Sequence, residues 1–117
     1  MILGFNPRFP EKIKKGIKVH TIREDKHNRW KAGMKIHFAT GVRTKNYNQF
    51  MEGVCTGIQQ IIIKPKQAFI LIDNHILDEE EIKILAKNDG FDNTEGFWKW
   101  FNKDFSGKII HWTDCRY

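Results

Sequence analysis

The stretch Gly16-Ile17-Lys18-Val19-His20-Thr21-Ile22-Arg23 decides how this sequence is interpreted. Before it, Pro10 opens a short helical turn over Glu11–Lys15. Gly16 suits the end of that turn, because glycine accepts the left-handed conformation found there. His20–Arg23 is rich in residues that favour extended structure and is predicted to be a strand. A helical turn, a bend and a strand are therefore expected in direct succession.

Short strand patterns surround this stretch. Met34-Lys35-Ile36-His37-Phe38 alternates apolar and polar side chains, as a half-buried strand does. We predict one long strand over Phe50–Ile63, with Gly57 at a bulge or a bend. The remaining predicted strands are Ile2–Asn6, Ala68–Ile72 and Lys108–Trp112.

Two helices are predicted in the second half of the chain. Asp78 and Glu81 form a capping-box pattern, in which each side chain bonds the backbone of the other. Asp92 and Glu95 repeat this pattern. Apolar stripes at helical spacing follow the two caps, and we expect them to pack in the core: Ile82, Leu85 and Ala86, then Phe97, Trp98 and Phe101.

These elements predict an α+β fold. About five or six short strands with bend-forming glycines favour a small β-barrel, with two or three short helices packed against it. The 117 residues suffice for a single domain spanning 1–117.

The sequence resembles the ASCH family of PUA-like β-barrels. Gly16–Arg23 is similar to the G-x-K-x-x-T-I-R pattern typical of that family, and Gly33 fits the glycine that precedes a strand in it. Ala86-Lys87-Asn88-Asp89-Gly90-Phe91 resembles the family's A-x-x-[E/D]-G-F segment. The similarity covers residues 2–112 and implies a barrel with a cleft between the barrel and the helices.

The resemblance also implies functions. The family is linked to RNA binding and translation, and some small bacterial members are amidohydrolases that remove the acetyl group from N4-acetylcytidine. Those enzymes use a lysine and a threonine of the first motif and a glutamate from the later helical region. By position, the catalytic residues here would be Lys18, Thr21 and, in place of the glutamate, Asp89. Aspartate departs from the family pattern by one methylene group, and Glu95 is expected to be occupied as a helix cap.

Amide hydrolysis places two demands on these residues. A threonine hydroxyl needs a base, and a lysine can serve only if burial or neighbouring cations lower its pKa; Arg23, Lys15 and His20 are the candidate cations. In a regular strand Lys18 and Thr21 would point to opposite faces. They can face one cavity only if the chain turns between Gly16 and His20.

Positive charge is concentrated in the first third of the chain. Segment 8–45 holds twelve Lys or Arg and three acidic residues, a local balance of +9, whereas the whole chain carries +6. A cationic face attracts polyanions such as RNA; a solvated lysine-rich surface is the alternative. Trp30 lies in the basic segment and Trp100 lies off the packed stripe, so both are candidates for stacking on bases. The predicted ligand-binding residues are Lys15, Lys18, His20, Thr21, Arg23, Trp30 and Trp100.

Several other classes are not favoured. No apolar stretch approaches the ~18 residues that cross a bilayer. The five histidines and two cysteines lack the spacing of a metal site, and no cofactor motif is present, so neither metal nor cofactor is expected. Cys55 and Cys115 are interpreted as reduced thiols in a cytoplasmic protein. The sequence does not indicate the oligomeric state.

Three hypotheses remain open. The first is a module that binds RNA or a modified nucleoside in a basic cleft. The second is an amidohydrolase that acts on an N4-acylated cytidine through Lys18, Thr21 and Asp89. The third is a protein-interaction domain without a working cleft, which a solvent-exposed Lys18 would favour.

Overall fold

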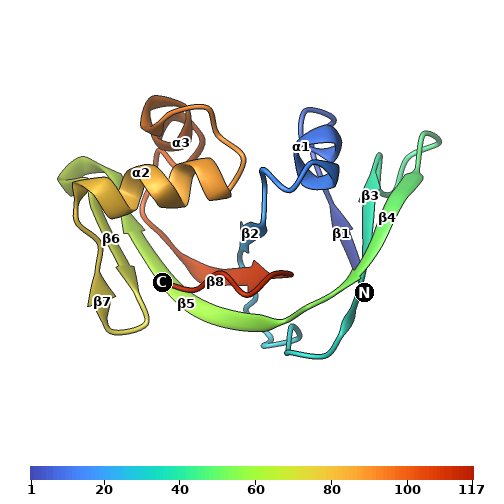
Figure 1. Ribbon diagram of the computed structural model, residues 1–117, viewed down its shortest axis with the longest axis horizontal. Coiled ribbons are helices and arrows are strands. Elements are labelled where there is room, and N and C mark those ends of the chain that lie inside the picture. Colours follow the sequence, from blue (N-terminus) through green and yellow to red (C-terminus); the bar gives the residue numbers. More distant parts are fainter.

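The computed structural model describes all residues from 1 to 117 and shows an α+β fold with two sheets and three α-helices (Figure 1). None of its helices combines the length and the apolar character that a membrane crossing requires. Helices α2 (Glu79–Asn88) and α3 (Thr94–Trp100) lie over the larger sheet, and α1 (Pro10–Lys14) lies near the smaller one.

The smaller sheet has the strand order β1-β3-β4. Strand β1 (Ile2–Gly4) pairs in parallel with β3 (Lys35–Thr40), and β3 pairs in antiparallel with β4 (Asn48–Val54). Ile36 and Phe38 of β3 are fully buried, as the alternating pattern predicted.

The larger sheet is antiparallel and has the order β2-β8-β5-β6-β7. Its strands are β2 (His20–Arg23), β8 (Phe105–His111), β5 (Gly57–Lys64), β6 (Phe69–Ile72) and β7 (His75–Ile76). A 3₁₀ turn, η1 (Pro65–Gln67), joins β5 to β6. The inner faces of both sheets and the three helices enclose one core of 21 buried apolar residues.

The prediction of one strand over Phe50–Ile63 was wrong. The ribbon runs on from one sheet to the other (Figure 1), but its pairing is interrupted at Cys55 and Thr56. The Cys55 amide donates to Met34 O in the smaller sheet, whereas the Thr56 amide donates to His111 O in the larger one. The chain therefore changes partners at this point, and the strand count rises to eight. No strand ladder closes the two sheets into a barrel, so the barrel stays a prediction.

The two predicted helices are present, and one of their caps differs. Asp78 and Glu81 form the predicted capping box of α2. Helix α3 is capped instead by Asn93, whose side chain accepts a hydrogen bond from the Gly96 amide. Asp92 does not cap the helix because its carboxylate pairs with Lys12 of α1 at 2.9 Å. Glu95 is therefore not occupied as a cap.

Candidate functional site

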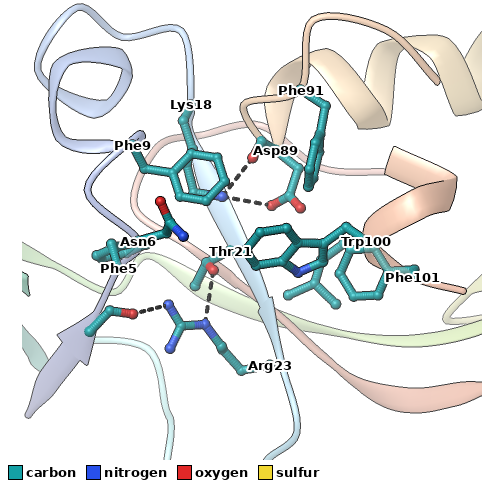
Figure 2. Close-up of a pocket in the computed structure, with 12 residues that line it drawn as sticks. Phe5, Asn6, Phe9, Lys18, Thr21, Arg23, Asp89, Phe91, Trp100 and Phe101 are labelled. Carbon is teal, nitrogen blue, oxygen red and sulfur yellow. Dashed lines mark hydrogen bonds and ion pairs between the residues drawn. The ribbon is translucent and has the colours of Figure 1, made fainter. Parts of the chain in front are cut away.

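A cavity of about 270 Å³ opens where the two sheets meet below the helices (Figure 2). Its walls come from three separate parts of the chain: the end of β1 with the start of α1, the stretch around β2, and the segment from the end of α2 through α3. Twelve residues line it: Gly4, Phe5, Asn6, Phe9, Lys18, Thr21, Ile22, Arg23, Asp89, Phe91, Trp100 and Phe101. This volume is close to the lower end of the range of volumes found for small-molecule binding sites.

The bend after α1 brings Lys18 to the pocket. Gly16 has a φ of +75°, and the Lys18 amide donates to Lys12 O, which ends the helix. The Val19 amide then donates to Asn88 O at 2.8 Å and fixes this segment to the end of α2. Lys18 therefore precedes the regular part of β2, and it lines the same cavity as Thr21. The chain therefore turns between Gly16 and His20, as the sequence required for Lys18 and Thr21 to face one cavity.

Lys18 and Asp89 form a buried ion pair. The Lys18 ammonium donates to Asp89 Oδ1 at 3.0 Å and to the Asp89 carbonyl oxygen at 2.6 Å. Only 2% of Lys18 and 3% of Asp89 are exposed. Burial lowers the pKa of Lys18, although the negative charge of Asp89 opposes this effect. Burial would raise the pKa of Asp89, but its contacts with Lys18 and His20 outweigh it and hold that pKa below its usual range.

Gly90 allows this close approach. Its φ of +96° is strained for other residues, and a Cβ there would lie 3.1 Å from both the Lys18 side chain and the Phe9 ring. The Lys12 ammonium donates to the Gly90 carbonyl oxygen at 2.7 Å. Helix α1 and the α2–α3 connection are thus held together over the pair.

Arg23 spans the gap between the two sheets. Its Nη2 donates to Gly4 O of β1 at 2.6 Å, and its Nε donates to Thr21 Oγ1 at 3.1 Å. Nη1 has no hydrogen-bond partner within the protein. With Lys18 and Arg23 charged against Asp89, the pocket carries one net positive charge.

Aromatic rings form one side of the pocket. Phe9, Phe91 and Trp100 contact one another edge to face, with centroids 5.8 to 6.0 Å apart. Trp100 is 48% exposed and stands at the opening. Phe9 also faces the Lys18 ammonium, which lies 4.6 Å from its ring centroid. A planar ligand would meet ring surfaces here.

The structure brings together five of the predicted site residues and leaves three outside. Lys18, Thr21, Arg23, Asp89 and Trp100 line the cavity. His20 is fully buried and lies behind Asp89, with Nδ1 3.3 Å from Asp89 Oδ1. Lys15 is exposed and pairs with Glu11 at 2.9 Å. Trp30 lies against a different, shallow hollow beside Glu24 and Lys26.

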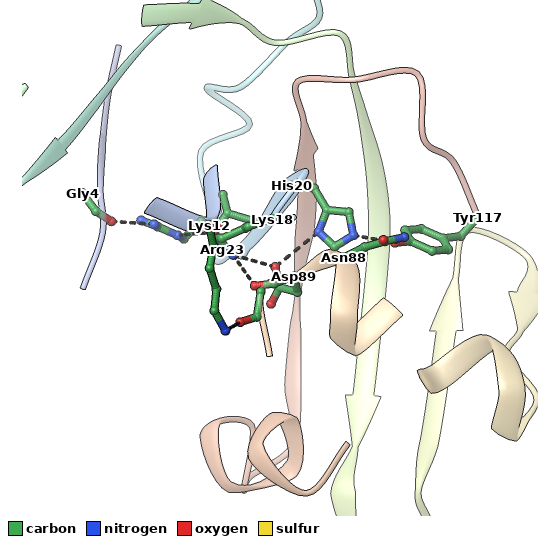
Figure 3. A network of polar contacts seen from close by, with 10 residues as sticks. Gly4, Lys12, Lys18, His20, Arg23, Asn88, Asp89 and Tyr117 are labelled. Atoms are coloured by element: carbon green, nitrogen blue, oxygen red, sulfur yellow. Dashed lines mark hydrogen bonds and ion pairs between the residues drawn. The ribbon is translucent and has the colours of Figure 1, made fainter. Parts of the chain in front are cut away.

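Other residues of the site were not predicted. Phe5, Asn6 and Phe9 line the pocket because β1 ends there, and nothing in their sequence pattern marks them as ligand contacts. Phe91 belongs to the Asp89-Gly90-Phe91 motif, which was a usable signal. Tyr117 reaches the polar network behind Asp89 (Figure 3), and no motif pointed to it.

No protein-family model, curated protein or solved structure matches this chain. The structure gathers no group of three or more His, Cys, Asp or Glu side chains that could hold a metal ion. Cys55 and Cys115 are both free. The chemistry of the pocket is therefore the basis for assigning a function.

Proposed function

We propose that this chain is an ASCH-like, PUA-like barrel domain of the cytoplasm whose pocket binds the base of a nucleoside or of an RNA nucleotide. The observation that carries the proposal is the composition of one cavity, which combines a buried ion pair with a wall of aromatic rings. A nucleobase is a planar ring with donors and acceptors on its edge, so it fits both features.

The polar groups of the pocket match a base edge. Arg23 Nη1, the Lys18 ammonium and the Asn6 amide supply donors, and the Asp89 carboxylate supplies an acceptor. The alternative of a non-functional cleft predicted an exposed Lys18, and Lys18 is buried.

Cations near the opening suit the phosphates of a polynucleotide. The Arg8 guanidinium lies 5.3 Å from the Phe9 ring centroid and 5.6 Å from that of Phe91. Lys12 and Lys14 follow on α1. RNA is preferred over DNA on the resemblance alone, and the electrostatic part of RNA affinity should fall as salt rises.

Replacing Trp100 with leucine is expected to weaken nucleoside binding about tenfold or more, because stacking on one aromatic ring contributes about 1–3 kcal/mol per base. The measurement is isothermal titration calorimetry with cytidine, uridine, adenosine, guanosine and N4-acetylcytidine. Trp30→Leu is the matched control and should leave the affinities unchanged, since Trp30 lies outside the pocket. The proposal fails if none of the five nucleosides nor a short RNA binds the unaltered protein.

A second candidate, hydrolysis of an N4-acylated cytidine, is favoured by Lys18, Thr21 and Asp89 lining one cavity. Thr21 Oγ1 accepts a hydrogen bond from Arg23, so its own proton is available to a base. With Lys18 in its neutral form, which burial favours, Oγ1 would attack the acyl carbon while its proton passes to Lys18. Lys18 would then give that proton to the departing N4 nitrogen, which releases cytidine. Water would then cleave the acyl-threonine ester.

Thr21→Val is expected to reduce this turnover to background, because it removes the nucleophile and keeps the shape of the side chain. Release of cytidine from N4-acetylcytidine is followed by chromatography, with Thr56→Val as the control outside the pocket. Equal turnover by Thr21→Val and the unaltered protein would rule out this mechanism.

A further inference from the structure

The Arg23 guanidinium is fixed in the wall of the pocket by contacts with neutral groups only. Its Nη2 donates to the Gly4 carbonyl oxygen at 2.6 Å, and its Nε donates to Thr21 Oγ1 at 3.1 Å. Its Cζ lies 5.0 Å from the centroid of the Phe5 ring, which adds a cation–π contact. The guanidinium is therefore held in place before a ligand arrives.

No carboxylate forms an ion pair with Arg23. The two acids that follow it in the sequence and the acid that lines the pocket all have other partners: Glu24 pairs with Lys26, Asp25 with Lys108, and Asp89 with Lys18. Burial lowers the pKa of Arg23, and the more distant charge of Asp89 opposes this effect only in part. Because arginine keeps its proton, a partly buried positive charge is left without a close counter-ion.

One nitrogen of Arg23 is free to bind a ligand. Nη1 makes no hydrogen bond within the protein, and it is accessible, because the buried side-chain atom that lacks a partner is Nδ1 of His111. Figure 2 shows the guanidinium at one end of the pocket and the Lys18–Asp89 pair at the other, with Thr21 between them. A ligand that fills the cavity therefore meets an unpaired positive charge at the Arg23 end.

The charge that suits this end is a single negative one. Lys18 and Asp89 offset each other in their buried pair, so the charge of Arg23 remains. A carboxylate or a phosphodiester carries one negative charge and accepts charge-assisted hydrogen bonds from a guanidinium. A phosphate monoester carries about −1.5 to −2 at pH 7 and would leave an excess of negative charge in the cavity that holds Asp89.

We propose that the pocket binds a planar ligand that carries one singly charged oxyanion, and that Arg23 Nη1 binds this oxyanion. Its two sources are a carboxylate attached to the ring and the phosphodiester beside a base in RNA. The planar part of the ligand rests on the proposed function, whereas the oxyanion part rests on the surroundings of Arg23 alone.

The test compares probes of similar shape that differ in charge, by isothermal titration calorimetry at pH 7 and physiological salt, which screens exposed lysines more than a pocket. The pairs are uracil-6-carboxylate with uracil-6-carboxamide, uridylyl-uridine with its neutral methylphosphonate analogue, and benzoate with benzamide. We expect a charged probe to bind about tenfold or more tightly than its neutral partner, because hydrogen bonds to charged groups are the stronger ones. A preference in the uracil pair identifies an acid on the ring, and a preference in the dinucleotide pair identifies RNA.

Two arginine variants show which residue causes the preference. Arg23→Gln can still reach the Gly4 carbonyl oxygen but has no charge, so the preference for the charged probe should disappear. Arg29→Gln is the matched control and should keep the preference, because Arg29 is exposed and lies outside the pocket. If Arg23→Gln does not fold, ¹⁵N NMR of the unaltered protein replaces it: the Arg23 guanidinium signal should shift more with the charged probe than with the neutral one.

The inference is overturned if no charged probe binds more tightly than its neutral partner, or if Arg23→Gln keeps the preference. The benzoate pair separates the inference from the proposed function. Tighter binding of benzoate than of benzamide, with no binding of any uracil or uridine probe, would support the oxyanion site and contradict the proposed function. Nucleosides that bind while charge makes no difference would support the proposed function and contradict the oxyanion site.

Discussion

Replacing Lys18 with methionine is expected to lower the free energy of unfolding by about 3–5 kcal/mol, because it leaves the Asp89 carboxylate buried without its charge partner. Methionine retains most of the side-chain volume, so the loss reports the charge rather than a cavity. Urea denaturation followed by tryptophan fluorescence measures it.

Two further variants distinguish the loss of the buried charge partner from the loss of packing around the Lys18 side chain. Lys15→Met removes a lysine from an exposed pair with Glu11 and should leave the unfolding midpoint close to its original value. Combining Lys18→Met with Asp89→Leu removes both charges and should recover much of the lost stability, since a buried pair can often be replaced by apolar residues. A double variant as unstable as Lys18→Met would show that the stability comes from packing around the lysine stem.

The protein is also expected to lose stability steeply between pH 6.5 and pH 4. Burial lowers the pKa of His20 and lowers that of His111 to about 3. The unfolded chain therefore binds protons below pH 6.5 that the folded chain does not, and stability falls as the pH falls. For His111 alone the loss from pH 7 to pH 4 is about 3 kcal/mol. The pKa of Asp89 is lowered as well, so its contribution is lost only below the unfolded value of 3.8.

Urea denaturation at a series of pH values tests this expectation. His111→Gln cannot take up the proton and should remove about 3 kcal/mol from the pH dependence. His27→Gln changes an exposed histidine that makes no hydrogen bond or ion pair within the protein and should leave the pH dependence intact. The assignment to His111 is wrong if both variants keep the full acid sensitivity. The buried Nδ1 of His111, which has no hydrogen-bond partner, is the structural sign of a neutral ring.

Local patterns in the sequence predicted the local features of the site. The Gly16 bend, the Asp78 cap and the packed Phe97 and Phe101 depend on neighbouring residues, and the structure contains all of them. The break at Cys55 was missed because it depends on which strands lie on either side, and an apolar run looks the same with or without such a change of partner. The Asn93 cap was missed because Asp92 is drawn to Lys12, 80 positions away.

The candidate site likewise contains residues that a local motif predicts and residues that only distant contacts bring there. Lys18, Thr21 and Arg23 belong to one motif, so the sequence could group them. The sequence favoured Trp30 and Trp100 equally as residues that stack on a base. Only the fold shows that Trp100 lines the pocket and that Trp30 lies elsewhere. Tyr117 lies 97 positions from His20, and the contact between them leaves no periodic signal in the sequence.

The three-part construction of the pocket has a consequence for finding its occupant. Its two central charges are 71 positions apart in the chain, so a partly unfolded molecule has no binding site. By mass action, any true occupant must then raise the melting temperature, and at a concentration of one hundred times its dissociation constant it adds about 2.7 kcal/mol. A thermal-shift screen of nucleosides, nucleotides and unrelated planar compounds would therefore rank candidate occupants without an assay for turnover.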